Sequence, residues 1–217
     1  MDKIKNILII GANSDIAQEL IKDSNYNFIC LSSKDSNFDI LNTNTFPIIK
    51  NLNGFVYFPG TINLKPFSNI KISEFEKDYN INNLGLINTL QFYLNEFTEN
   101  SSFVFISSIA AKIGMKYHTS ISMCKSAIEG LTVSLAAELS PKIRVNCISP
   151  SIIDTKLSSR ILRNDKIKED IIQKHPMKKI GSTKNIANAI EFLLSDKSEW
   201  ITGQTINIDG GYSNLKN

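Results

Sequence analysis

The sequence predicts an α/β fold in which helices cover both faces of a doubly wound, mostly parallel sheet. Short runs rich in Ile, Val and Phe alternate with longer stretches of helical spacing, and this alternation is typical of repeated strand-helix units. The apolar runs are mostly continuous, as strands buried on both faces require. A length of 217 residues and an apolar content of 42% suit one domain with a large core.

The elements follow in order along the chain. The strand candidates are runs of β-branched and aromatic residues: Lys5–Ile10, Asn27–Ser32, Gly54–Phe58, Phe103–Ser107, Arg144–Ile148 and Thr205–Ile208. Apolar residues at helical spacing predict helices over Ser14–Lys22, Ser73–Glu99, Ser120–Leu139 and Lys184–Leu194. No linker or repeat divides residues 1–217, so we expect a single domain. The charged segment Lys156–Lys178, here named the lid segment, follows the penultimate strand and is expected to be the least ordered part, covering the ligand crevice.

Composition argues against several classes of function. The 24 basic and 21 acidic residues are spread through the chain without a basic block, so a nucleic-acid partner is not expected. Cys30, Cys124 and Cys147 are widely spaced and only two histidines accompany them, which predicts reduced thiols and no metal site. No apolar run approaches the roughly 18 residues of a membrane span, and the first apolar run leads into a glycine turn. We therefore expect a cytoplasmic protein without a membrane partner.

The stretch NILIIGANSDIAQELI contains the first motif. A strand runs into Gly11, a tight turn follows, and a helix opens near Ser14. Free backbone N–H groups and the positive end of the helix dipole therefore face whatever lies above the strand, which favours a phosphate. Taken alone, this pattern is common and leaves nucleotide binding open.

Further motifs give a specific resemblance. In order and spacing, GANSDIA, YNINNLG, SSIAAKIG, the helix with Lys125, RVNCISPS and WITGQTINIDGGYS resemble the short-chain dehydrogenase/reductase family, and within it the 3-ketoacyl-acyl-carrier-protein reductase-like branch. The resemblance covers nearly the whole chain and is most specific at ITGQTINIDGG. It implies a Rossmann-type fold with about seven parallel strands. It also implies an oxidoreductase that uses NAD(H) or NADP(H) on a small carbonyl or alcohol substrate.

The family's catalytic set matches this sequence except at one position. Family members use an Asn, a Ser, and a Tyr and Lys in Y-x-x-x-K spacing, which places the last two on one helix face. The resemblance puts the Asn at Asn82, the Ser at Ser108 and the Lys at Lys125. In relatives the Ser orients the carbonyl, the Lys binds the nicotinamide ribose and lowers the pKa of the Tyr, and the Asn helps to hold a water. The position of the Tyr, which is the general acid, holds Ile121, whose side chain cannot transfer a proton.

Several groups remain open as the substitute acid. Tyr117 would lie roughly 12 Å from Lys125 along the axis if the helix extended back to it, but a loop before Ser120 would bring it closer. Thr119 and Ser120 are expected to cap the helix, and His118 to be solvated. Tyr117, a water or a group on the substrate are the alternatives, and the role expected for Lys125 is to bind the cofactor ribose.

The cofactor positions also depart from the family pattern. Asp15 and Ala17 replace two glycines of the first turn, and we expect Asp15 to point aside and cap that turn. Ser33 and Lys34 come before Asp35 at the end of the second strand, which favours NADP(H) over NAD(H). The family's next helix is expected to be absent, which leaves an open adenine end. The expected cofactor residues are Gly11, Asn13, Ser14, Asp15, Ile16, Ser33, Lys34, Asp39, Ile40, Gly60, Lys125, Pro150, Ile152, Ile153 and Thr155.

Two functions remain open at this point. One is an NADP(H)-dependent oxidoreductase with a displaced acid. The other is a catalytically inactive NAD(P)-binding protein that acts as a sensor or a structural partner in an assembly. The resemblance further implies a homodimer or homotetramer formed through the helices that begin near Ser73 and Ser120.

Overall fold

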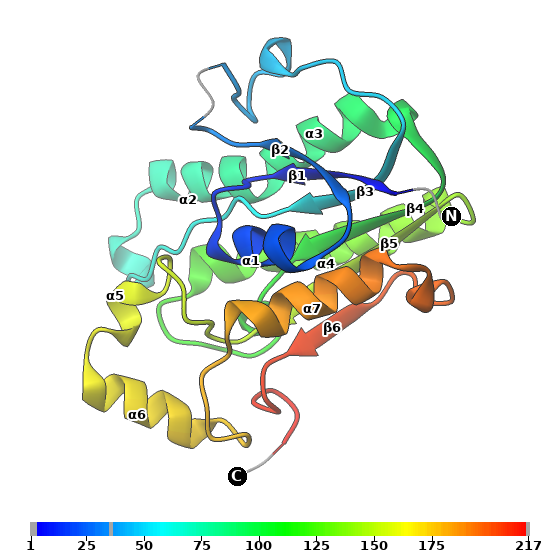
Figure 1. Cartoon of the computed structure of the whole chain (residues 1–217). Helices are drawn as coiled ribbons and strands as arrows, with labels where there is room; N and C mark the ends of the chain where they lie inside the picture. The colour runs from blue at the N-terminus through cyan, green and yellow to red at the C-terminus, as the bar shows by residue number, and fades with distance from the viewer. Residues whose placement is uncertain (1–3, 35–36, 216–217) are drawn as a thin grey trace.

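A computed structural model describes residues 4–34 and 37–215, and its central feature is one parallel sheet. The strands lie in the order β2-β1-β3-β4-β5-β6 (Figure 1). Their bounds are Asn6–Ile10 (β1), Asn27–Leu31 (β2), Leu52–Tyr57 (β3), Phe97–Ile106 (β4), Ile143–Pro150 (β5) and Thr205–Ile208 (β6). The predicted α/β fold is therefore confirmed.

The sheet has six strands, so the expectation of about seven was wrong. After β2 the described chain folds over α3 (Gly85–Tyr93) instead of adding a strand at the free edge of β2. Phe38 and Phe46 are each 7% exposed, and the ring of Phe46 lies 6.0 Å from that of Tyr93 and parallel to it. Burial of these rings in the core explains why the segment is irregular, with only a 3-10 turn at Thr43–Thr45.

Helices cover both faces of the sheet (Figure 1). On one face α1 (Asp15–Asp23) and α7 (Thr183–Leu194) pack on Ile7 and Ile9 of β1. On the other face α3 and α4 (Thr119–Leu139) pack on Leu8 and Ile10. Alternate residues of β1 thus enter two different cores, which explains its continuous apolar run. No helix in residues 4–34 and 37–215 is long and apolar enough to cross a bilayer.

The helix predicted over Ser73–Glu99 is divided in the structure. It consists of α2 (Ile72–Tyr79), a π turn at Asn80–Leu84, α3, and a 3-10 turn at Leu94–Glu96. Phe97 already belongs to β4, because its ring is buried against Phe103, 4.5 Å away. The π turn adds a residue to one helical turn at Asn82, and such turns are frequent at functional sites.

The lid segment is more regular than expected. It contains α5 (Ser159–Leu162) and α6 (Asp165–Lys174), which extend beyond the carboxyl ends of the strands (Figure 1). The side chain of Asn164 accepts a hydrogen bond from the N–H of Ile167 and so caps α6. Local capping thus gives part of the segment a helical conformation, and its part as a cover for the ligand crevice stays a prediction.

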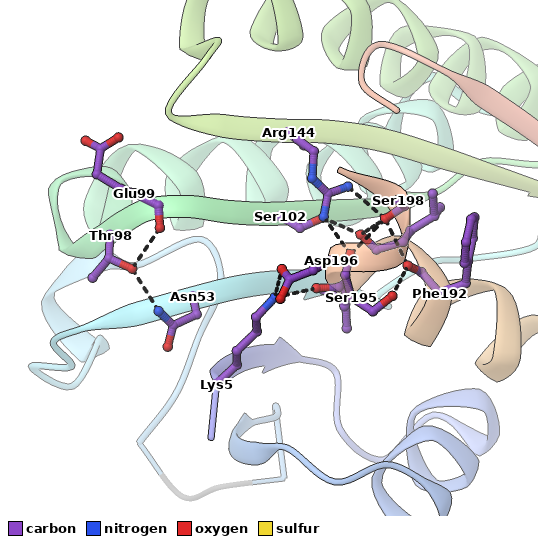
Figure 2. A network of polar contacts seen from close by, with 12 residues as sticks. Lys5, Asn53, Thr98, Glu99, Ser102, Arg144, Phe192, Ser195, Asp196 and Ser198 are labelled. Carbon is purple, nitrogen blue, oxygen red and sulfur yellow. Dashed lines mark hydrogen bonds and ion pairs between the residues drawn. The ribbon is translucent and has the colours of Figure 1, made fainter. Parts of the chain in front are cut away.

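Polar contacts close the opposite end of the sheet, at the amino ends of the strands (Figure 2). The guanidinium of Arg144 on β5 donates to Ser198 Oγ at 3.0 Å and to the carbonyl of Ser195 at 3.1 Å. Lys5, just before β1, pairs with Asp196 at 2.5 Å. These contacts hold the end of α7 against two strands at the edge opposite the predicted cofactor turn.

Candidate cofactor and active site

The turn between β1 and α1 requires its glycine for two reasons. Gly11 has a φ of +79°, and a Cβ there would lie 2.9 Å from Cδ of Pro59. Its N–H donates to the carbonyl of Leu31 at 2.8 Å, which fixes the turn beside β2. The chain then enters α1 at Asp15, and the first N–H groups of α1 have no partner within the helix. These donors lie at the carboxyl edge of the sheet, where an anion is stabilised.

Asp15 points aside as expected, but it does not cap its own turn. Its Oδ2 accepts the backbone N–H of Lys156 at 2.7 Å, and its Oδ1 lies 3.2 Å from Lys156 Nζ. Ser14, at the N-cap position, makes no side-chain cap hydrogen bond either. The carboxylate therefore joins α1 to the first residue of the lid segment.

The end of β2 is held by a contact from the first turn. Asn13 Nδ2 donates to Ser32 Oγ at 2.6 Å, and Ser33 and Lys34 follow as exposed residues. Asp35 lies outside the residues that the structure describes. Ser33 also lines an open pocket of about 690 Å³, together with Asn37, Phe38, Asp39, Asn42, Asn44, Thr45, Phe46 and Pro47.

The pair Asp39-Ile40 is fixed by backbone contacts. Asp39 Oδ1 accepts the N–H of Leu41 at 2.9 Å, and the carbonyl of Ile40 accepts Asn88 Nδ2 at 3.1 Å. The described residues between β2 and β3 contain the 3-10 turn at Thr43–Thr45 and no α-helix. Tyr57, the last residue of β3, is 2% exposed and donates to the carbonyl of Ile81.

Lys125, Asn82 and Gly60 come together at the carboxyl ends of β3 and β4. Lys125 is 9% exposed, and its Nζ donates to the carbonyl of Ile106 at 2.8 Å. A Cβ on Gly60 would lie 3.6 Å from Lys125 Nζ and 3.3 Å from Asn82 Oδ1. The absence of a side chain at Gly60 therefore leaves space directly in front of both polar groups.

A buried network fixes the amide of Asn82. Its Nδ2 donates to the carbonyl of Asp78 at 2.8 Å and to Thr61 Oγ1 at 3.0 Å. The Asp78 carboxylate in turn accepts hydrogen bonds from Thr61 at 2.5 Å and Ser120 at 2.6 Å. Asn82 Oδ1 is buried without a partner among residues 4–34 and 37–215, and it lies on the side of Gly60 and Lys125. A buried oxygen without a partner at the edge of a site indicates a hydrogen-bond donor from a ligand or water.

Sequence reasoning missed Asp78 and assigned Ser120 a different role. Ser120 was expected to cap α4, but its hydroxyl donates to Asp78 and α4 begins at Thr119. Asp78 lies four residues before Asn82, on the same helical face as the buried stripe. That spacing could have identified Asp78 from the sequence, because an acidic residue on a buried helix face needs hydrogen-bond partners.

Burial changes the protonation of Lys125. Removal from water disfavours the ammonium form and lowers the pKa of Lys125 to about 8. Ser107 beneath it is directed inward, with its hydroxyl 2.9 Å from Glu129 Oε1. Lys125 is therefore a positive charge at neutral pH that holds its proton less firmly than an exposed lysine.

Ser108 lies at the edge of the same cluster, just after β4. Its Oγ accepts the N–H of Ala110 at 3.3 Å and caps the 3-10 turn at Ile109–Ala111. That contact uses a lone pair of the oxygen, so the hydroxyl proton is available to a ligand. The residue is half-buried.

The two residues that bear on the missing acid lie in different environments. Ile121 is 5% exposed and lies one turn before Lys125 on α4. Tyr117 precedes the helix with a φ of +68° and is 55% exposed. The structure thus brings Ile121 to the buried side of α4 and leaves Tyr117 in the outer loop.

The loop after β5 has a fixed conformation. Pro150 ends the strand, and Ile153 forms an isolated parallel bridge with Gly181. The N–H of Thr155 donates to Ser158 Oγ at 3.1 Å, and Ser158 Oγ also contacts the carbonyl of Ile153. The predicted residues lie at the same edge as Ser108: Pro150 ends β5, and Ile152, Ile153 and Thr155 follow it.

These residues fit a nicotinamide dinucleotide. The space in front of Gly60, the unpartnered Asn82 Oδ1 and the free N–H groups of α1 lie along one edge of the sheet. Ligands of open α/β sheets bind at this carboxyl edge. Within the described part of the chain, no group of three or more His, Cys, Asp or Glu side chains is arranged to hold a metal ion.

Comparisons with known proteins agree with this geometry. Residues 16–213 match the family model described as Enoyl-(Acyl carrier protein) reductase. Tropinone reductase-like 3 of Erythroxylum coca is 34% identical over 139 residues, which cover 64% of this chain and 54% of that protein. The 3-oxoacyl-[acyl-carrier-protein] reductase FabG of Thermotoga maritima is 31% identical over 145 residues, 65% of this chain and 58% of the relative. The matches thus span little more than half the length of these curated relatives.

Solved structures share the whole fold. A short chain dehydrogenase family protein from Francisella tularensis superposes with a TM-score of 0.89 at 26% identity, covering 98% of this chain and 100% of that one. A small-chain dehydrogenase in complex with NADPH superposes with a TM-score of 0.87 at 21% identity, covering 97% and 99%. The family match, the relatives and the shared fold agree, and the chain belongs to the short-chain dehydrogenase/reductase family.

Proposed function

We propose that the chain is an NADP(H)-dependent oxidoreductase that acts on a small carbonyl or alcohol substrate, with an active site that lacks the usual Tyr. The observation that carries the proposal is the cluster of Lys125, Asn82 and Gly60 beside Ser108. Among the described residues, the hydrogen bond of the buried ammonium goes to a backbone carbonyl, and the amide oxygen beside it has no partner. This arrangement is costly unless a ligand uses both groups.

The cofactor would be held along the carboxyl edge of the sheet. The turn residues Gly11, Asn13, Ser14, Asp15 and Ile16 would face the diphosphate, Asp39 and Ile40 the adenine, and Lys125 the nicotinamide ribose. Ile152, Ile153 and Thr155 would lie beside the nicotinamide, which supplies or accepts the hydride when it is bound. Two features support NADP(H): Ser33 and Lys34 are exposed after β2, and the Asp39 carboxylate is turned to its own backbone.

The chain's own residues would complete the chemistry of carbonyl reduction. The hydroxyl of Ser108 donates a hydrogen bond to the carbonyl oxygen and orients the substrate. Lys125 gives up a proton, directly or through a water, to the oxygen that becomes the alcohol, and its neutral amine regains a proton from solvent. The lowered pKa of Lys125, about 8, supports this role. Tyr117 is the alternative donor, and it would need movement of the loop before α4.

A second function is favoured by a specific observation. Ile121 is 5% exposed and apolar at the position of the family's acid, and the nearest Tyr in sequence is directed to solvent. A catalytically inactive NAD(P)-binding protein, acting as a sensor or assembly partner, would keep the cofactor residues and lose turnover. In either case we propose a cytoplasmic homodimer or homotetramer.

Fluorescence titration with NADPH and NADH tests the part that both functions share. We expect micromolar binding with NADPH bound more tightly, and no binding of either at millimolar concentration contradicts both functions.

Gly11→Val should abolish binding, because a side chain there meets Pro59 and strains a positive φ. The matched control is Gly114→Val, since a Cβ at Gly114 meets nothing within 4 Å. Turnover of diacetyl by the natural chain then distinguishes the enzyme from the inactive protein.

A further inference from the structure

A buried imidazole lies outside the cluster around Lys125. His175 follows α6 and is 3% exposed. Its Nδ1 lies 2.7 Å from the carbonyl oxygen of Ile171, and its Nε2 lies 3.0 Å from Ser151 Oγ. None of the functions described above uses this pair.

Three parts of the chain surround the imidazole. Ile171 belongs to α6, Ser151 follows β5, and the third part is the turn after β6. In that turn the ring of Tyr212 lies 4.9 Å from the imidazole, and a Cβ on Gly210 would lie 3.7 Å from His175 Cδ2. The ring is therefore fixed in position by packing as well as by hydrogen bonds.

Asp209, just after β6, is a charged group close enough to His175 to interact with it. Burial opposes ionisation of Asp209, yet hydrogen bonds from the Ser213 hydroxyl and from the N–H groups of Ser213 and Gly211 lower its pKa overall. Its oxygens are taken up by these donors within the turn after β6. The hydrogen bonds of the imidazole thus go to Ile171 and Ser151 and not to a carboxylate.

The contact with Ile171 fixes a hydrogen on Nδ1 of His175, and the direction of the hydrogen bond with Ser151 follows when the imidazole is neutral. A carbonyl oxygen only accepts hydrogen bonds, so Nδ1 of His175 must carry a hydrogen. In the neutral imidazole Nε2 then has a lone pair, and the hydroxyl of Ser151 donates to it. Because its proton is used in this way, Ser151 Oγ can only accept a hydrogen bond from a ligand.

The register of the sheet places Ser151 beside Ser108. Ile106 of β4 pairs with Ile148 of β5, and the N–H of Ser107 donates to the carbonyl of Ile148 at 2.8 Å. Ser108 follows β4 by two residues and Pro150 ends β5, so both lie at the carboxyl edge of two neighbouring strands, which run about 4.8 Å apart. Ser151 comes one residue later, at the edge where the proposed ligand binds.

We propose that Ser151 Oγ accepts a hydrogen bond from the carboxamide N–H of the nicotinamide, and that His175 is the positioning residue that holds the hydroxyl in this orientation. This inference rests on the proposed function. It assigns recognition of the amide group to a side chain of the loop after β5, and it gives the end of the lid segment a part in that recognition through His175.

The test compares the binding of NADP⁺ with that of its acetylpyridine analogue, in which a methyl group replaces the amide NH₂. We expect the natural chain to prefer NADP⁺ about tenfold. Ser151→Ala should bring the ratio of dissociation constants close to one. His175→Asn keeps a donor for Ile171 but lacks a group at the position of Nε2, so it should lower the ratio in the same way.

Two further variants separate positioning from simple stability. His175→Gln places an amide oxygen near the position of Nε2 and should restore most of the preference. Ser159→Ala is a matched control on α5, because the Ser159 hydroxyl donates to the nearby carbonyl of Lys156 at 2.8 Å, and it should leave the ratio unchanged. If Ser151→Ala binds NADP⁺ and keeps the natural ratio, the inference is wrong while the proposed function stands. If the natural chain binds neither compound, both are overturned.

The orientation of the imidazole is testable without cofactor. The chain has two histidines, so His118→Gln leaves a single set of histidine signals in a ¹⁵N spectrum. We expect hydrogen on Nδ1 of His175 and a shift of the Nε2 signal in Ser151→Ala. Hydrogen on Nε2 alone would contradict the assigned direction of the hydrogen bond.

Discussion

Lys125 places a positive charge in a nearly closed site, and the resulting loss of stability is measurable. Burial lowers its pKa from an ordinary value of 10.5 to about 8. Between these pH values the unfolded chain binds more protons than the folded chain, so the free energy of unfolding should rise with pH in this window. Across this window the free energy of unfolding of the natural chain should rise by ~3 kcal/mol more than that of Lys125→Met. Urea unfolding of the natural chain and of Lys125→Met at pH 7.5 and pH 10.5 measures this change. If the stabilities of the two chains differ by the same amount at both pH values, Lys125 is not a buried ammonium.

Ile121 tests whether the missing hydroxyl limits turnover. Ile121→Tyr places a phenol one turn before Lys125, where the ammonium would lower its pKa and make it an acid. Reduction of diacetyl with NADPH should rise by about 100-fold or more over the natural chain. Ile121→Phe is the matched control, since it adds the same ring without the hydroxyl. Equal rates for the Tyr and Phe variants would show that the acid comes from another group.

At the level of elements, the contact between Asp15 on α1 and Lys156 in the lid segment should affect cofactor binding. Asp15→Asn keeps an acceptor for the N–H of Lys156 but removes a negative charge beside the proposed diphosphate site. We expect NADPH to bind about tenfold more tightly, with a smaller gain at high salt. Asp23→Asn, at the other end of α1 and paired with Lys184, is the control. Unchanged affinity in Asp15→Asn would place the carboxylate away from the phosphates.

The elements around the site differ in how far the sequence predicts them. The strand, glycine and helix around Gly11 follow from local rules, because a continuous apolar run, a positive φ and a helix start each have a residue signature. The π turn at Asn80–Leu84 has none, since helical spacing continues through it. Contacts between distant segments, such as Asp15 with Lys156 and Ser151 with His175, depend on the tertiary fold. For this reason the family resemblance located Lys125 and Asn82, while Asp78 and His175 were found only in the structure.

For the whole molecule, we expect the outer face of α4 to be the contact with a second copy in the proposed oligomer. Its exposed positions between Met123 and Ala137 carry no charge: Met123, Ser126, Ala127, Gly130, Val133, Ser134 and Ala137. A helix face that is neutral and made of small residues allows close approach of an identical helix across a two-fold axis. Val133 is 57% exposed and Met123 47%, so apolar surface is available to be buried.

Gly130 allows this association to be tested without damage to the protomer. A Cβ there meets nothing within 4 Å, and replacing a glycine inside a helix adds up to about 1 kcal/mol of helix propensity. Gly130→Arg should therefore fold at least as stably as the natural chain, yet its charge should block the contact. Sedimentation velocity should show a dimer or tetramer for the natural chain and a smaller species for Gly130→Arg. The control is Gly114→Arg, because Gly114 is an equally open glycine in the loop before α4, and this variant should assemble like the natural chain. An unchanged assembly in Gly130→Arg would move the interface away from α4, because an arginine cannot be buried at a neutral two-fold contact without a partner charge.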